Sequence, residues 1–181
     1  MRSVSMLDLK AEYRLIRDEV RAAVDAVLES QHFIGGPAVG ELELALATHC
    51  GVKHAIAISN GTDALLCALM ALEIGHGDEV ILPSFTFFAT AGTVARLGAK
   101  PVFVDIDPQT FNIDPVLIAK AVTPKTRAII PVHLFGLCAD MAPILELARR
   151  HHLWVVEDAA CALGAAYQGR QAGTFGDAGC F

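Results

Sequence analysis

The sequence has no apolar run that approaches the roughly 18 residues of a membrane-spanning helix. It also lacks the apolar stretch of a signal peptide, because Asp8, Lys10 and Glu12 stand near the start of the chain where that stretch would lie. Its five cysteines form no CxxC pair, and their odd number favours reduced thiols over a disulfide scaffold. These absences predict a soluble cytoplasmic protein with no membrane partner.

Basic residues are also scarce. Lys and Arg number 14 against 20 Asp and Glu, so the formal net charge is -6, which argues against nucleic acid as the main partner. Neither the P-loop pattern GxxxxGKS/T nor the dinucleotide pattern GxGxxG follows a predicted strand. His151 and His152 follow a predicted helix without the partners of a metal site, so no metal is predicted.

Apolar residues are abundant, at 54% of the chain, and their spacing changes along it. Helical spacing predicts N-terminal helices between residues 7 and 50. Short β-rich runs follow at 54–59, 79–82, 101–106, 127–132 and 153–157, and helical stretches separate them at 62–74, 87–97, 115–121 and 140–151. The α/β region at 54–181 therefore predicts βαβ units, in a three-layer αβα fold with a mainly parallel sheet.

Open parallel sheets bind ligands beyond the carboxyl ends of their strands, so the residues that follow each strand are site candidates. The stretch SNGTDAL leads from a strand into a helix, and the first amides of that helix, with Gly61 and the Thr62 hydroxyl, would seat a phosphate or carboxylate. An ordinary N-cap at Asn60 or Thr62 fits the stretch equally well. The aromatics of PSFTFFAT, at Pro83–Thr90, would stack on a flat ligand or belong to the core.

Two carboxylates, Glu157 and Asp158, end the last of these strands. Successive strand residues point to opposite faces, so one is expected to face solvent or a helix terminus and the other the cleft, unless the pair only caps the strand. A carboxylate beside a phosphate seat and an aromatic face can keep a pyridine nitrogen protonated, which makes the ring of pyridoxal phosphate (PLP) an electron sink. His133 ends another strand, where a satisfied structural histidine is favoured over a ligand contact.

The chain from Leu7 to Phe181 resembles the DegT/DnrJ/EryC/StrS sugar aminotransferases, which are fold-type I PLP enzymes. The resemblance rests on seven short sequence blocks that occur in the same order as in that family. The blocks are FIGGPAV, SNGTDAL, PSFTFFAT, PVFVDIDPQTFNIDP, IIPVHLFG, VEDAA and GDAGCF. The resemblance implies that residues 1–181 form part of a PLP-binding large domain, with the C-terminal small domain absent. It also implies a nucleotide-linked keto-sugar as substrate, glutamate as amino donor and a homodimer when the enzyme is intact.

The resemblance assigns six cofactor-binding residues by position: Gly61, Thr62, Asp63, Phe87, Asp158 and Cys161. The first three would hold the phosphate, Phe87 would lie against the ring, and Asp158 would pair with the pyridine nitrogen. Cys161 stands where the family often has Gln or His to contact the ring hydroxyl, and a thiol is a poor hydrogen-bond partner.

No lysine of the sequence is predicted to lie at this site. PLP transamination needs a lysine that holds the cofactor as a Schiff base and moves a proton, but the five lysines fall on helices or just ahead of strands. In the resembling family that lysine follows GDAGCF, so the chain is expected to be the first half of a longer enzyme and inactive alone. A catalytically inactive PLP-binding or regulatory protein and a PLP-dependent sugar dehydratase remain the alternatives.

The resemblance also bears on stability. In the family, the strand at 54–59 pairs with a strand that lies beyond Phe181. Without that partner the strand would expose unpaired backbone groups, so the isolated chain is expected to be only marginally folded.

Overall fold

The computed structural model describes residues 8–181, and its contacts group into two compact units, one up to Ala45 and one from Leu46. Helix α1 (Leu9–Ser30) lies in the first unit, and α2 (Pro37–Cys50) begins there and ends in the second. Asp8 caps α1, since its side chain accepts a hydrogen bond from the Ala11 amide at 3.0 Å. Helices were predicted here, although the predicted start at Leu7 lies outside the described residues. Within residues 8–181, no helix combines the length and the apolar character needed to cross a membrane.

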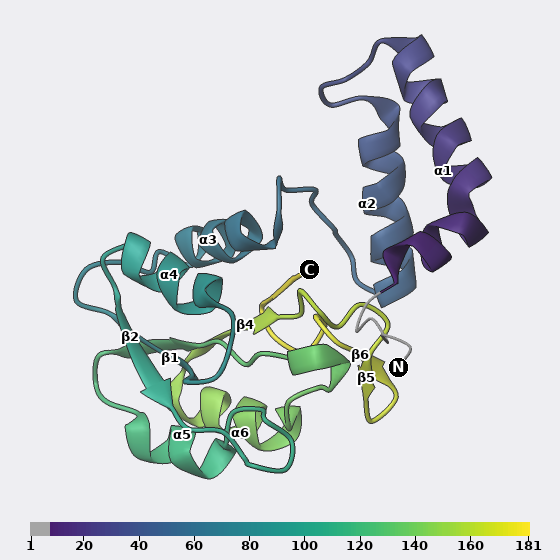
Figure 1. Cartoon of the computed structure of the whole chain (residues 1–181). Coiled ribbons are helices and arrows are strands. Elements are labelled where there is room, and N and C mark those ends of the chain that lie inside the picture. The colour runs from purple at the N-terminus through teal and green to yellow at the C-terminus, as the bar shows by residue number, and fades with distance from the viewer. Residues whose placement is uncertain (1–7) are drawn as a thin grey trace. The chain divides into compact units, whose positions relative to one another are not determined.

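The second unit is built on a five-stranded sheet whose strands pair in parallel in the order β2-β1-β3-β4-β7 (Figure 1). The strands are β1 (Glu79–Pro83), β2 (Lys100–Val104), β3 (Thr126–Ile129), β4 (Trp154–Asp158) and β7 (Ala178–Cys180). Helices α3 (Gly61–Ala71) and α4 (Phe88–Arg96) cover one face, and α5 (Pro115–Ala121) and α6 (Met141–His151) cover the other. The predicted α/β class, with a parallel sheet between two helical layers, is confirmed.

Alternate residues of the strands pack into two separate cores. In β1, Val80 and Leu82 join the cluster under α3 and α4, whereas Ile81 joins the cluster over α5 and α6. All three side chains are fully buried. A strand covered on both faces favours apolar side chains along its whole length, which explains the continuous apolar runs in the sequence. A polar side chain in such a strand needs buried hydrogen-bond partners.

The strand predicted at 54–59 is wrong for this chain, because these residues form no strand in the structure. A strand needs a neighbour to satisfy its backbone groups. β4 lies between β3 and β7, and β7 comes from the GDAGCF block. No described strand pairs with residues 54–59. The marginal stability expected for the chain stays a prediction.

A short antiparallel hairpin, β5 (Ala166–Tyr167) with β6 (Arg170–Gln171), was not predicted. Its strands have two residues each, which is too few to produce a recognisable alternation of apolar and polar residues. The other predicted strands and helices are present, with their ends shifted by a few residues.

Candidate functional site

A cavity of about 210 Å³ lies at the carboxyl edge of the sheet, where residues that follow β1, β3 and β4 meet the start of α3. Of the six residues predicted to bind the cofactor, five line it: Gly61, Thr62, Phe87, Asp158 and Cys161. The structure thus brings together residues that lie as far apart in sequence as positions 61 and 161. Asp63 is the one predicted residue that does not line the cavity.

Asp63 takes part in the N-cap of α3. Its amide donates to Oδ1 of Asn60 at 2.9 Å, and its carboxylate accepts from Nδ2 of Asn60 at 3.1 Å and from the Ser59 hydroxyl. The N-cap interpretation therefore holds for Asn60. The first amides of a helix have no acceptor within the helix, so those of Gly61 and Thr62, which precede Asp63 in the same turn, are suited to an anion in the cavity.

Gly61 allows a close approach at the start of α3. A Cβ at this position would lie 3.2 Å from the carbonyl oxygen of Phe181 and 3.7 Å from Cβ of Ala160. The contact with Phe181 is tighter than usual, so a side chain at residue 61 would require its neighbour to shift by a few tenths of an ångström. The missing side chain thus allows the first turn of α3 to lie close to Phe181 and to Ala160, which follows β4.

Asp158 ends β4 on the cavity side of the sheet and is only 7% exposed. Its Oδ2 accepts a hydrogen bond of 2.7 Å from the hydroxyl of Thr90, in the first turn of α4. Thr90 was not predicted as a site residue, although it belongs to PSFTFFAT and its amide donates to the carbonyl oxygen of Phe87, the N-cap residue of α4, at 3.2 Å. The Phe87 side chain is 75% exposed, so its ring is accessible to a ligand.

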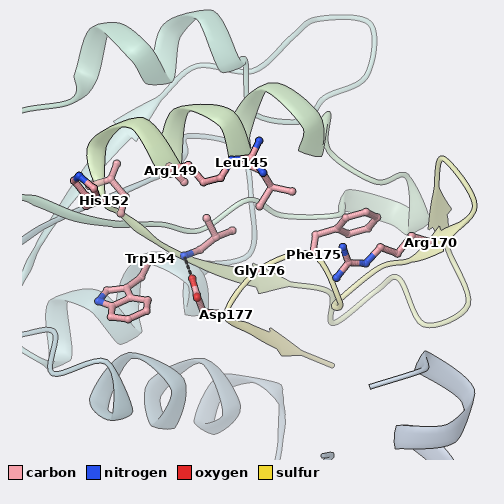
Figure 2. A pocket seen from close by; sticks show the side chains of 11 residues that line it. Leu145, Arg149, His152, Trp154, Arg170, Phe175, Gly176 and Asp177 are labelled. Atoms are coloured by element: carbon pink, nitrogen blue, oxygen red, sulfur yellow. Dashed lines mark hydrogen bonds between the residues drawn. The ribbon is translucent and has the colours of Figure 1, made fainter. Parts of the chain in front are cut away.

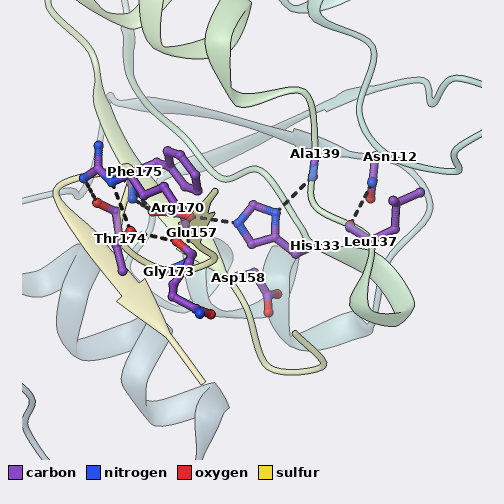
Figure 3. Close-up of polar contacts among 12 residues, drawn as sticks. Asn112, His133, Leu137, Ala139, Glu157, Asp158, Arg170, Gly173, Thr174 and Phe175 are labelled. Atoms are coloured by element: carbon purple, nitrogen blue, oxygen red, sulfur yellow. Dashed lines mark hydrogen bonds and ion pairs between the residues drawn. The ribbon is translucent and has the colours of Figure 1, made fainter. Parts of the chain in front are cut away.

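Glu157 points to the opposite side of β4 and is fully buried. Its Oε1 accepts from the amides of Phe175 at 2.6 Å and Gly176 at 2.7 Å. Its Oε2 accepts from the Gly173 amide and pairs with Nε2 of His133, both at 2.8 Å (Figure 3). The carboxylates of Glu157 and Asp158 point in opposite directions, as expected. The expectation that the carboxylate directed away from the cavity faces solvent or a helix terminus is wrong, because loop amides and His133 bond to Glu157 in the interior.

The contacts of His133 determine which of its ring nitrogens carries the proton. Nδ1 accepts a hydrogen bond of 3.1 Å from the Ala139 amide, so the proton of the neutral ring lies on Nε2 and is donated to Glu157. The side chain is 1% exposed and both nitrogens are used. The structural role that the sequence favoured for His133 is confirmed by these contacts.

The cavity wall at 132–134 is held from several directions. The amide of His133 donates to the carbonyl oxygen of Asp158 at 2.9 Å, beside the side-chain contact with Glu157. Asn112 accepts from the Leu134 amide at 3.2 Å and donates to the Leu137 carbonyl at 2.9 Å (Figure 3). These bonds fix the segment after β3 against the end of β4.

A larger cavity, of about 640 Å³, lies at the amino end of β4 (Figure 2). Its lining includes Arg149, Trp154, Arg170 and Asp177, and the Asp177 carboxylate accepts from the Val155 amide at 2.9 Å. None of the predicted cofactor-binding residues lines it. Size alone therefore does not identify the site, and the smaller cavity is the one that matches the predicted chemistry.

Lysine is absent from the residues that line the smaller cavity. Lys100 begins β2 at the amino edge of the sheet, where its Nζ lies 2.9 Å from Oε1 of Glu79. Across residues 8–181, no group of three or more His, Cys, Asp or Glu side chains is arranged to hold a metal ion.

Comparison with known proteins now identifies the family. The model of the DegT/DnrJ/EryC1/StrS aminotransferase family matches residues 14–181. The chain belongs to this family. The resemblance inferred from the seven blocks is thereby confirmed.

Two curated relatives and one solved structure show how far the similarity extends. The chain is 52% identical over 179 residues to the "pleiotropic regulatory protein" of Geobacillus stearothermophilus, covering 99% of this chain and 48% of that protein. It is 49% identical over 177 residues to the UDP-2-acetamido-2-deoxy-3-oxo-D-glucuronate aminotransferase of Pseudomonas aeruginosa, covering 98% and 49%. The crystal structure of S. venezuelae DesV superposes with a TM-score of 0.93 at 47% identity, covering 96% of this chain and 47% of that one. The chain spans about half the length of the curated relatives it matches.

The environment of Glu157 predicts a large loss of stability in Glu157→Gln. A glutamine has only one acceptor oxygen, so its NH2 group would face two of the four donors that now bond to the carboxylate. We expect the free energy of unfolding, measured by urea denaturation, to fall by about 2–4 kcal/mol. The matched control is Glu146→Gln, which removes an exposed i,i+4 ion pair with Arg150. We expect this variant to change the free energy of unfolding by less than about 0.5 kcal/mol. Equal losses in the two variants would contradict the conclusion that the buried hydrogen bonds of Glu157 stabilise the fold.

Proposed function

We propose that this chain is the cofactor-binding half of a PLP-dependent aminotransferase that acts on a nucleotide-linked keto-sugar. The proposal rests on one observation: Gly61 and Thr62 at the start of α3, Phe87 and Asp158 all line the same cavity. When bound, PLP supplies an electron sink through which an amino group is transferred to a carbonyl carbon. The family, and a relative whose name specifies a UDP-linked keto-sugar, support the substrate class.

The residues of the cavity fit the two ends of this cofactor. The amides of Gly61 and Thr62, with the Thr62 hydroxyl and the positive end of the α3 dipole, would hold the phosphate. The carboxylate of Asp158 would be the anionic partner that keeps the ring nitrogen protonated. The exposed ring of Phe87 would cover one face of the pyridine, and the Cys161 thiol would make at most a weak contact with the ring hydroxyl.

The Schiff-base lysine is proposed to follow Phe181 in the complete enzyme. Cys180 pairs in register with Asp158, and the Phe181 carbonyl lies beside Gly61, so residue 181 stands next to the cavity. A lysine a few residues further along would be within reach of a ligand there. By resemblance we also propose glutamate as the amino donor and a homodimer as the intact enzyme. The five cysteines are free thiols, which suits a cytoplasmic location.

One observation favours a second candidate, a regulatory protein that binds PLP without catalysis: the relative at 52% identity is named a pleiotropic regulatory protein. The reading frame after Phe181 distinguishes the candidates. A lysine within about ten residues supports the aminotransferase, because transamination requires that amine. A stop codon supports the regulatory protein, and a histidine at the lysine's position supports a PLP-dependent sugar dehydratase.

The proposed role of Asp158 predicts that Asp158→Ala in the complete enzyme lowers kcat for sugar amination by about 100-fold or more, because the ring nitrogen loses its anionic partner. The control is Asp140→Ala, whose carboxylate accepts a hydrogen bond from the Tyr167 hydroxyl at 2.6 Å and does not line the cavity. We expect this variant to retain wild-type kcat. Wild-type turnover by Asp158→Ala would refute the role.

Cofactor binding is also predicted to protect one cysteine from alkylation. Cys161 is exposed and lines the cavity, Cys67 is exposed on α3 but does not line it, and Cys180 is buried. Burial, together with the nearby Asp158 and Glu157 carboxylates, raises the pKa of Cys180 to about 12. Its reactive thiolate is therefore only about one part in 10,000 at pH 8.

With iodoacetamide at pH 8, peptide mapping by mass spectrometry should show modification of Cys67 and Cys161 and none of Cys180. Saturating PLP should slow the modification of Cys161 and leave that of Cys67 unchanged. If PLP slows both cysteines equally, or neither, the cavity is not where the cofactor binds.

A further inference from the structure

Two threonines connect the start of α4 to the carboxylate of Asp158. The Thr90 hydroxyl, which is fully buried, donates to Oδ2 of Asp158 at 2.7 Å. The hydroxyl of Thr86 lies 2.9 Å from the hydroxyl of Thr90 and belongs to a residue that lines the cavity. The resulting hydrogen-bonded chain runs from Thr86 through Thr90 to Asp158.

The positions of the protons in this chain follow from chemistry. An ionised carboxylate can only accept hydrogen bonds, so the single proton of the Thr90 hydroxyl is donated to Asp158. Thr90 then has only lone pairs for its second contact, and Thr86 must donate to it. The hydroxyl of Thr86 is left with lone pairs alone, so toward a ligand in the cavity it acts as an acceptor.

The two oxygens of Asp158 are therefore not equivalent. Oδ2 is engaged by Thr90, whereas the one hydrogen bond to Oδ1 among the described residues is a long contact of 3.4 Å from the Ala160 amide. A short bond to a side chain in the first turn of α4 fixes the rotation of the carboxylate, and Oδ1 remains open to a further donor.

We infer that Thr90 is a positioning residue: it holds Asp158 through Oδ2, so that Oδ1 meets the protonated ring nitrogen, and Thr86 orients the Thr90 hydroxyl. The inference rests on the proposed PLP function for its ligand. The orientation of the Asp158 carboxylate does not depend on that function and can be observed without any ligand.

The experiment compares Thr90→Val with Thr93→Val in the complete enzyme. Valine matches threonine in shape and lacks the hydroxyl. Thr93 is a buried threonine of the same helix whose hydroxyl donates to the Ala89 and Thr90 carbonyls and makes no contact with Asp158. We expect the PLP dissociation constant, from a fluorescence titration, to rise about tenfold or more in Thr90→Val, because a hydrogen bond to a charged group is lost. In Thr93→Val we expect it to stay within about threefold.

A second pair isolates the hydroxyl even if Thr90→Val does not fold. Thr90→Ser and Thr90→Ala both lose the methyl group and differ only in the hydroxyl. We expect the serine variant to bind PLP about as tightly as wild type and the alanine variant to share the loss. Equal affinity of the serine and alanine variants, or an equal loss in Thr93→Val, would overturn the inference.

Ligand-free crystal structures separate this inference from the proposed function. We expect the Asp158 carboxylate to rotate or become disordered in Thr90→Ala and to keep its wild-type position in Thr90→Ser. If wild-type enzyme binds no PLP, the proposed function fails and the carboxylate comparison alone decides the role of Thr90. An unchanged carboxylate in Thr90→Ala overturns that role whatever the cofactor result.

Discussion

Two buried carboxylates follow each other at the end of β4, and the cavity depends on how each of them is satisfied. An unpaired buried carboxylate is too costly to persist in its ionised form. Glu157 is satisfied by three loop amides and His133. Asp158 is bonded by Thr90 at Oδ2, and within residues 8–181 its Oδ1 has only a long contact with the Ala160 amide. Because the two residues are adjacent on one strand, the contacts that fix Glu157 in the interior also fix the backbone from which Asp158 enters the cavity.

The architecture of the α/β unit was readable because it follows from local patterns. Apolar runs such as Val80–Leu82 are long enough for strands buried on both faces, and the helices between them show their own spacing. The segment at 54–59 is also largely apolar but forms no strand. A strand also requires a partner, and pairing between distant segments leaves no local signature. The two-residue strands β5 and β6 are too short to carry any pattern.

The convergence of the candidate residues on one cavity followed from topology, since parallel strands bring their carboxyl ends to one edge. Local geometry decided the details. Asp63 was assigned with Gly61 and Thr62, but the N-cap of Asn60 uses its amide, a detail set by backbone angles at one residue. The surroundings of Glu157 could not be predicted at all, because three of its four partners are main-chain amides, which every residue except proline provides. Thr90 could have been found as a polar residue of PSFTFFAT, the block that contains Phe87.

The approach of the Phe181 carbonyl to Gly61 has a consequence for the order of folding. Contacts between segments so far apart in the chain close large loops, which is entropically unfavourable, so they tend to form after the local ones. The inner strands and their helices can assemble first, whereas the contact between Phe181 and the start of α3 forms only once β7 has joined β4. Because Gly61 also lines the cavity, a small molecule bound there would favour the sheet in which β7 has joined β4, by an amount that grows with the ligand concentration.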